Sequence, residues 1–191
     1  MSGTKVPTSN EVQANGTFSG GGEFAKVYLM PDDKAVKISA FASADGWLWW
    51  AVYSIIYAGK SDHLPVIHGL RINVRDNSFV AVLDALKEVR TGQDDDPDET
   101  HLEAFYDAED EFDALVDGLV ELVQENGGPR TLTDYDQMYN WMLDADDTAI
   151  LTDPVCFHGW RAAKTSKGWT LDALIELIKR CPKTRDFVEL V

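Results

Sequence analysis

Apolar and polar residues alternate over two short segments near the N-terminus, and this pattern predicts a β-hairpin. The segment AKVYL (25–29) alternates in the manner of a strand with one buried face. The residues that follow, MPDDK (30–34), combine a proline with two aspartates, which is typical of a turn. The segment AVKIS (35–39) is then expected to return as a second strand.

A helix and a second hairpin are predicted next. The segment WLWWAVYSIIYAG (47–59) is apolar almost all round, so a helix here must be buried on more than one side. Asp45 is its expected N-cap and Gly59 its expected stop. We expect its tryptophans to pack in the core rather than form a stacking platform for nucleic acid. Residues 64–86 read as strand, turn at Asp76 and Asn77, and strand.

The pattern becomes helical in the second half. The segment TGQDDDPDET (91–100) has the composition of a solvated linker, and residues 101–126 place apolar side chains at helical spacing with acids between them. Residues 138–153 then predict a short hairpin. TLDALIELIKR (170–180) is an amphipathic closing helix, with Thr170 as its expected cap.

These elements predict an α+β fold in one compact unit. Residues 18–86 form its sheet-rich part with one helix, residues 87–191 its helical part, and residues 1–17 a flexible leader rich in Ser, Thr, Asn and Gly. Two cysteines, Cys156 and Cys181, lack metal-ligand spacing and are expected to be buried free thiols.

The net charge of the protein limits the kinds of molecule that it is expected to bind. The formal net charge is -16, which disfavours nonspecific attraction to nucleic acid phosphates or to anionic membranes. No window approaches the length of apolar sequence that a membrane span needs, and the N-terminal segment has no apolar secretory core. We therefore expect a cytoplasmic protein with a protein partner, no direct binding to nucleic acid and no membrane contact.

A glycine cluster precedes the first predicted hairpin strand. Gly20, Gly22, Phe24, Ala25 and Val27 fit the pattern G-x-G-x-[FY]-[small]-x-V, with alanine at the usual third glycine. Backbone amides at such a hairpin tip can approach a polyphosphate because no Cβ intervenes. The cluster therefore predicts a phosphate loop, although a flexible join has a similar composition.

Three further residues resemble those of protein kinases. Lys37 lies in AVKI, which resembles the V-A-I-K element whose lysine pairs with the nucleotide α- and β-phosphates. Asn140 precedes Asp153 by thirteen residues, and the two resemble the catalytic-loop Asn and the D-F-G Asp that hold Mg²⁺ in kinases.

The combination resembles a subgroup, the early serine/threonine protein kinases of T-seven-like short-tailed phages. The residues that carry this likeness are AVLDAL (81–86) at the connection between lobes and TDPV (152–155) in place of D-F-G. The resemblance implies a small two-lobed fold that transfers the γ-phosphoryl of ATP, with Mg²⁺, to Ser or Thr of host proteins during host takeover. It also implies that the protein works in the cytoplasm of the host bacterium.

The resemblance assigns a role to each candidate residue. Loop residues Gly20, Gly22, Ala25 and Val27 would cover the nucleotide, and Lys37 would pair with its phosphates. Val82 to Leu86, with Leu83, Asp84 and Leu86 as contacts, would line the adenine. Asn140 and Asp153 would hold the metal ions.

The kinase pattern is broken at two places. Tyr135 stands where the family has its catalytic Asp, five residues before the Asn, and Asp134 and Asp136 flank it as alternative bases. A phenol with a pKa near 10 is a poor base at neutral pH. No Asp or Glu lies between Gly46 and Gly59 to pair with the lysine, so Asp45 is the nearest substitute.

These departures leave two alternatives to an active kinase. One is a pseudokinase that keeps the fold and binds a host protein through its acidic surface. The other is an acidic DNA mimic that inhibits a host transcription, defence or restriction protein. Oligomeric state is not fixed by the sequence.

Overall fold

A six-stranded sheet forms the centre of the protein, in a computed structural model that describes residues 5–21, 25–89, 98–133, 140–157 and 169–191. The strand order is β1-β2-β3-β5-β4-β10, and neighbours are antiparallel except for the parallel pair β10 and β4. The strands are β1 (Thr17–Gly21), β2 (Ala25–Leu29), β3 (Lys34–Ser39), β4 (Ile67–Asn73), β5 (Ser78–Asp84) and β10 (Val188–Leu190).

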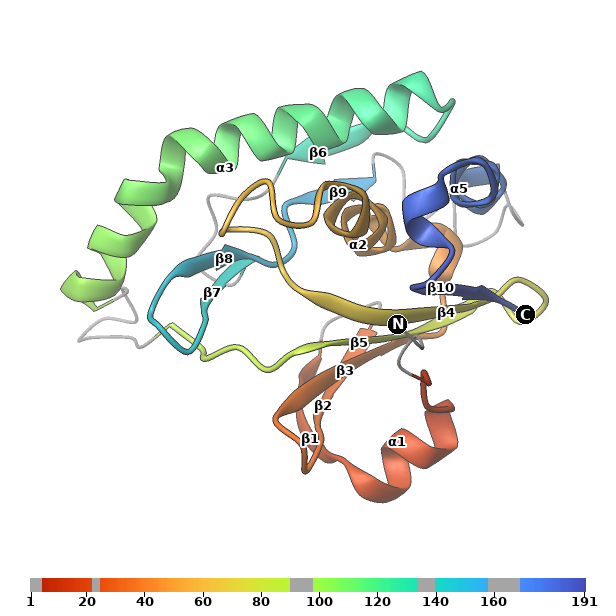
Figure 1. Cartoon of the computed structure of the whole chain (residues 1–191), viewed down its shortest axis with the longest axis horizontal. Helices are drawn as coiled ribbons and strands as arrows, with labels where there is room; N and C mark the ends of the chain where they lie inside the picture. The colour runs from red at the N-terminus through yellow and green to blue at the C-terminus, as the bar shows by residue number, and fades with distance from the viewer. Residues whose placement is uncertain (1–4, 22–24, 90–97, 134–139, 158–168) are drawn as a thin grey trace.

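Helices cover both faces of this sheet. The short helix α1 (Ser9–Asn15) lies on one side, and α2 (Gly46–Tyr57), α3 (Glu99–Glu125) and α5 (Trp169–Arg180) lie on the other, with α3 outermost (Figure 1). Two small two-stranded sheets lie between α3 and the large sheet. They pair β6 (Thr131–Thr133) with β9 (Val155–Phe157), and β7 (Trp141–Leu143) with β8 (Ala149–Leu151).

The expected α+β class is confirmed, as are the hairpins β2–β3, β4–β5 and β7–β8 and the helices over residues 46–57 and 99–125. Asp45 caps α2, and Gly59 beyond its end has φ 75°, a conformation that glycine adopts without strain. Asp98 caps α3, while most of the expected linker lies outside the described residues.

The N-terminal segment contains a helix that sequence analysis missed. Thr8 and Glu11 form a capping box: the Thr8 amide donates to the Glu11 carboxylate at 2.7 Å and the Glu11 amide donates to the Thr8 hydroxyl at 3.3 Å. Val12 is fully buried against Val36, Val80 and Val82 of the sheet. Residues 9–15 are thus helical where the composition suggested a loose leader.

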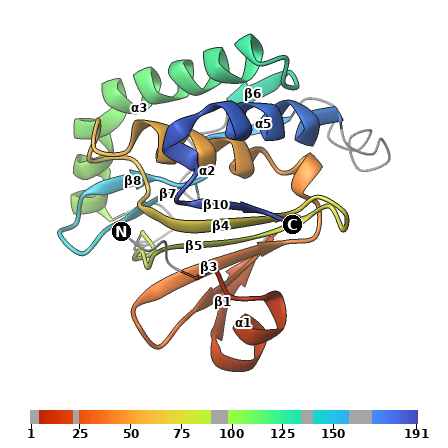
Figure 2. The same cartoon turned by 45° about the vertical axis from the view of Figure 1, so that its right-hand side comes forward.

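The C-terminal residues were missed as well. Strand β10 lies beside β4 and pairs with it (Figure 2). The carbonyl of Phe187 accepts the Leu70 amide at 2.8 Å. Three residues are too few to show alternation. Helix α5 begins at Trp169, so Thr170 lies inside the helix and the prediction that it is the cap is wrong.

Cys156 and Cys181 are both half-buried, whereas the sequence predicted that they are buried. Within the described residues, no helix has both the length and the apolar character to cross a bilayer.

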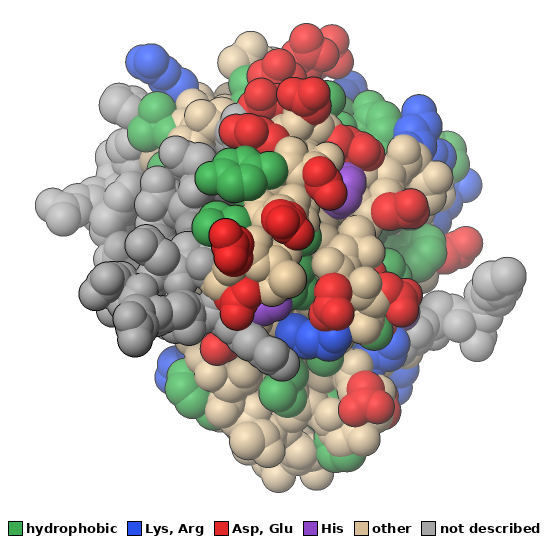
Figure 3. All heavy atoms as spheres, turned by 90° about the vertical axis from the view of Figure 1, so that its left-hand side faces the viewer, with side chains coloured by type: hydrophobic (Ala, Val, Ile, Leu, Met, Phe, Trp, Pro, Cys, Tyr) green, Lys and Arg blue, Asp and Glu red, His purple; other side chains and the backbone are tan. Residues whose placement is uncertain are grey.

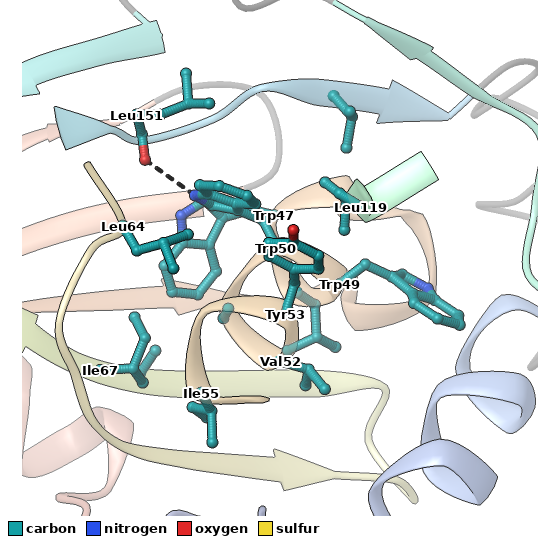
Figure 4. Packing of buried hydrophobic residues seen from close by; sticks show 14 of the residues in the cluster. Trp47, Trp49, Trp50, Val52, Tyr53, Ile55, Leu64, Ile67, Leu119 and Leu151 are labelled. Atoms are coloured by element: carbon teal, nitrogen blue, oxygen red, sulfur yellow. Dashed lines mark hydrogen bonds between the residues drawn. The ribbon is translucent and has the colours of Figure 1, made fainter. Parts of the chain in front are cut away.

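Helix α2 is the centre of the hydrophobic core. Trp47, Trp49 and Trp50 are each at most 3% exposed, which confirms core packing for these three tryptophans. The Trp50 indole Nε1 donates to the carbonyl oxygen of Leu151 at 3.0 Å (Figure 4). That bond fixes the end of β8 to α2.

We expect Trp50→Phe to destabilise the protein by about 1–3 kcal/mol, because the buried Leu151 carbonyl loses its donor and the smaller ring leaves space. Urea unfolding of the variant beside wild type measures the loss. An unchanged midpoint would mean that this bond does not hold β8 to α2.

Candidate functional site

Strand pairing brings several predicted residues to one face of the sheet. Lys37 of β3 pairs with Val27 of β2 and with Ala81 of β5. Directly paired residues share a face, and alternate residues along a strand do too. Ala25 and Leu83 therefore lie on the Lys37 face, which packs toward α2 because Ala81 belongs to the core around that helix.

Gly20 belongs to the same face, since it pairs with Val27. A Cβ added at Gly20 would meet no atom of the described residues within 4 Å. Gly20 thus belongs to the antiparallel pair β1–β2, and the phosphate loop predicted for the glycine cluster stays a prediction. Gly22 lies outside the described residues.

Lys37 reaches the second predicted metal ligand from a distant part of the chain. Its Nζ lies 3.4 Å from Oδ2 of Asp153, a partner 116 residues away in sequence, and 4.5 Å from the centroid of the Trp47 ring. The Lys37 side chain is 13% exposed and that of Asp153 42%. The ammonium is thus enclosed by an indole face and a carboxylate that opens to solvent.

Asn140 and Asp153 are brought together by the β7–β8 hairpin. The main-chain carbonyl of Asn140 accepts the Thr152 amide at 2.8 Å and the Asp153 amide at 3.1 Å. Asn140 is itself 5% exposed. The thirteen-residue spacing seen in the sequence therefore closes a hairpin and puts both predicted metal ligands at its open end.

Asp45 joins this group from the N-terminus of α2. Its Oδ1 accepts the Trp47 amide at 2.9 Å, which is the capping bond. Oδ2 is buried without a hydrogen bond of good geometry among the described residues, and a hydrogen bond with the Ser39 side chain lowers the pKa of the carboxyl. Glycine at position 46 allows this approach: a Cβ there would lie 2.5 Å from the Val155 carbonyl oxygen, just beyond Asp153. The first turn of α2 is therefore pressed against β9.

Burial changes the acidity of Asp45. Removal from water raises the pKa of its carboxyl to about 6, because the charged form is poorly solvated there. The Lys37 ammonium opposes this rise in pKa and the Asp153 carboxylate adds to it. Perturbed acids of this kind gather at functional sites more often than elsewhere.

The predicted adenine contacts divide between the two faces. Leu83 shares the Lys37 face, but the next residue, Asp84, points to the α1 face by alternation along β5. There its Oδ1 is bonded to Lys34 Nζ at 2.5 Å and to His68 Nε2 at 2.8 Å. Partial burial works against ionisation, but those two contacts outweigh it and lower the Asp84 pKa. Only the Asp84 backbone is thus placed for a ligand on the Lys37 face.

Leu86 is half-buried just beyond β5, before the bridge that joins Lys87 to Leu143. The two candidate bases, Asp134 and Asp136, lie outside the described residues, as does Tyr135. Of the described residues that flank this segment, Asn140 accepts the Asp153 amide with its main-chain carbonyl, and Thr133 pairs with Val155, two residues after Asp153.

The side chains of Asp153 and Asn140 suit Mg²⁺ better than a metal ion whose ligands all come from the protein. Among the described residues, no cluster of three or more His, Cys, Asp and Glu side chains has a geometry for a metal ion. Mg²⁺ is usually held by one or two carboxylates together with substrate phosphates and water. The half-exposed Asp153 next to Asn140 fits that requirement.

A hollow of about 340 Å³ lies elsewhere, on the α1 side of β4 and β5. Its lining includes Thr8, Arg71 and Asp76 but none of the predicted site residues.

Sequence reasoning missed Trp47 as a site residue, because its apolar neighbours identified it only as core. The available signal was its position, two residues after the N-cap Asp45. No protein-family model matches this chain, and no curated protein sequence matches it.

We expect Asp45→Asn to stabilise the protein at neutral pH. A carboxyl whose pKa is about 6 when folded, against 3.8 for its ordinary value, costs up to about 3 kcal/mol once both states are ionised. That cost is absent below pH 4 and grows as pH rises to 6. Asparagine keeps the cap without the charge.

Urea unfolding at pH 4, 5, 6 and 7.5 measures this gain, which should vanish at the acidic end. Asp98→Asn at the cap of α3 is the matched control and should not stabilise the protein, because a helix N-terminus favours a negative charge that is not buried. A gain that does not depend on pH would contradict the assigned cause.

Proposed function

We propose that this protein binds ATP with Mg²⁺ at the Lys37 face and transfers the γ-phosphoryl to Ser or Thr of host proteins. One observation carries the proposal: Nζ of Lys37 on β3 lies 3.4 Å from Oδ2 of Asp153, which follows β8 in the chain. Protein kinases use a lysine on the third strand for the phosphates and an aspartate for the metal. Lys37 and Asp153 match the kinase pattern in the sequence, and their side chains also lie close together in space.

The order of elements supports the same proposal. A glycine hairpin, a lysine strand, a helix, two strands and a long helix precede the hairpin that bears Asn140 and Asp153. This order fits a small two-lobed kinase fold, with the phage serine/threonine kinases as the family it resembles most. The division would fall after Leu86, at the connection to α3.

Each residue then has a chemical task. Lys37 neutralises phosphate charge and fixes the phosphate position, and Gly20 leaves room for phosphates near the backbone of β1. Asn140 and Asp153 would hold Mg²⁺, which neutralises charge on the phosphates when bound. Leu83 supplies an apolar surface on the same face of the sheet.

The transfer itself needs an acceptor for one proton. The substrate hydroxyl oxygen bonds to the γ-phosphorus, the bond to the β–γ bridging oxygen breaks and ADP leaves. The hydroxyl proton passes to a carboxylate, for which Asp134 and Asp136 are the candidates in this sequence. They precede Asn140 by six and four residues in the sequence.

A second candidate function is supported by the acidic surface of α3. Its exposed carboxylates are Glu99, Glu103, Asp107, Glu109, Asp110, Glu111, Asp113, Asp117, Glu121 and Glu125, and acidic side chains gather on the face drawn in Figure 3. Such a surface favours a basic partner. A pseudokinase or DNA mimic would use it to inhibit a host protein in the bacterial cytoplasm.

We expect ATP with Mg²⁺ to raise the melting temperature of wild type and to leave that of Lys37→Met unchanged, because a ligand that binds only the folded state stabilises it. At a ligand concentration of 100 times Kd the gain is about 2.7 kcal/mol.

Lys26→Met is the matched control, since Lys26 is an exposed lysine on the neighbouring strand β2. It should respond to ATP as wild type does. Equal shifts in wild type and Lys37→Met would place the nucleotide elsewhere, and no shift in wild type would remove the proposed function.

A further inference from the structure

A second group of charged side chains lies on the face of the sheet opposite to Lys37. Lys34, Asp84 and His68 come from β3, β5 and β4, three strands that lie side by side (Figure 2). Nζ of Lys34 and Nε2 of His68 both approach Oδ1 of Asp84, at 2.5 Å and 2.8 Å, and lie 3.0 Å from each other. These three residues are called the Lys34–His68–Asp84 cluster below.

Strand register places this cluster on the α1 face of the sheet. Lys34 pairs with Asp84, and Val36, two residues further along β3, belongs to the same hydrophobic cluster as Val12 of α1. Alternate residues of a strand share a face. The side chains of the Lys34–His68–Asp84 cluster therefore point away from a ligand bound at Lys37.

The cluster holds the residue at which the chain leaves β5. Asp84 is the last residue of that strand. The Asp84 amide donates to the Val66 carbonyl at 3.3 Å, and the Ala85 amide donates to the Asp33 carbonyl at 3.4 Å. Both bonds are longer than the usual range of about 2.7–3.2 Å. The main chain alone thus holds this end of β5 weakly, and the shorter side-chain contacts of Asp84 add to it.

Position, more than stability, is what these contacts supply. The side chains of Lys34, His68 and Asp84 are 31%, 28% and 41% exposed, and ion pairs that solvent reaches add little to stability. Two contacts from two different strands nevertheless fix the Asp84 carboxylate in two directions. At a binding site, a small displacement of one group has a large effect on the ligand.

We propose that Lys34 and His68 are positioning residues that act through the Asp84 carboxylate and hold the main chain of residues 84–86 where the adenine of ATP binds. This inference rests on the proposed nucleotide function, and it adds two residues that touch no part of the nucleotide. The proposed phosphate site at Lys37 lies on the other face of the sheet. The cluster should therefore affect the binding of the base and leave the binding of the phosphates unchanged.

The test compares ATP with inorganic tripolyphosphate, which carries the phosphates without the base. Isothermal titration calorimetry in excess Mg²⁺ at pH 7.5 gives the Kd of both ligands for wild type, Asp84→Asn and Lys34→Met. We expect each variant to weaken ATP binding on the order of ten-fold, a usual size for coupling between two sites. Tripolyphosphate binding should change by less than about three-fold, well below that coupling.

Glu189→Gln is the matched control. Glu189 accepts from Nε of Arg71 at 2.8 Å across β10 and β4, and Arg71 pairs with Val80, four residues before Asp84 on β5. This variant also removes a cross-strand carboxylate from the α1 face, but it should bind both ligands as wild type does. Lys34→Arg keeps a charged donor for Asp84 and should restore ATP binding to within about three-fold of wild type.

Two results would overturn the inference directly. One is ATP binding that Asp84→Asn and Lys34→Met leave unchanged, and the other is an equal loss for ATP and tripolyphosphate. A loss of ATP binding in Glu189→Gln as large as in Asp84→Asn would also overturn it, because it would show a general effect of a weakened sheet. If Asp84→Asn does not fold, Lys34→Met and His68→Gln replace it.

Failure of the wider proposal has a different signature. Wild type would then bind neither ATP nor tripolyphosphate, and the inference would fall with it. Wild type that binds ATP no more tightly than tripolyphosphate would overturn the inference alone, because the base would then contribute nothing. If tripolyphosphate binds too weakly to titrate, adenosine takes its place and must lose affinity by the same factor as ATP.

Discussion

Burial of α2 between the sheet and the outer helix is the constraint on which the rest of the structure depends. Trp49 and Trp50 are almost wholly enclosed, and the Trp50 indole fixes the end of β8 through Leu151. Gly46 allows the first turn to touch β9. Helix α2 thus positions Leu151 and Val155, which lie two residues before and two residues after Asp153 in the chain. The same helix places the Trp47 ring against the Lys37 ammonium. The core and the candidate site share the same contacts.

The buried carboxyl of Asp45 lowers the stability of the protein, and the fold does not require its charge. Asp45 could cap α2 as asparagine or serine, yet it carries a carboxyl whose pKa burial raises to about 6. Functional sites often retain such groups at the expense of stability. The favourable partner is Lys37, and the exposed Asp153 keeps that lysine within reach of solvent and of any phosphate that binds there.

Local patterns predicted most of the elements, whereas their relations needed the structure. Alternation and turn residues identified the β2–β3 and β4–β5 hairpins, and the segments MYNWML (138–143) and TAILTD (148–153) identified the β7–β8 hairpin. Helix α1 and strand β10 were missed because each is short and depends on packing against the sheet. The side of the sheet that Asp84 faces follows from strand register, and the raised pKa of Asp45 follows from burial. Strand register and burial both depend on contacts between distant segments, so neither can be deduced from one segment of the sequence.

The central claim is that Lys37 and Asp153 belong to a site for phosphoryl transfer. The most direct measurement is the transfer of labelled γ-phosphate from ATP to proteins of a bacterial lysate, with wild type, Asp153→Asn and Asp146→Asn side by side. The account predicts labelled Ser or Thr with wild type and Asp146→Asn, whose carboxyl lies in the exposed β7–β8 turn, and a loss of at least about 100-fold with Asp153→Asn. Labelling that Asp153→Asn leaves intact, or no labelling by wild type, would contradict it.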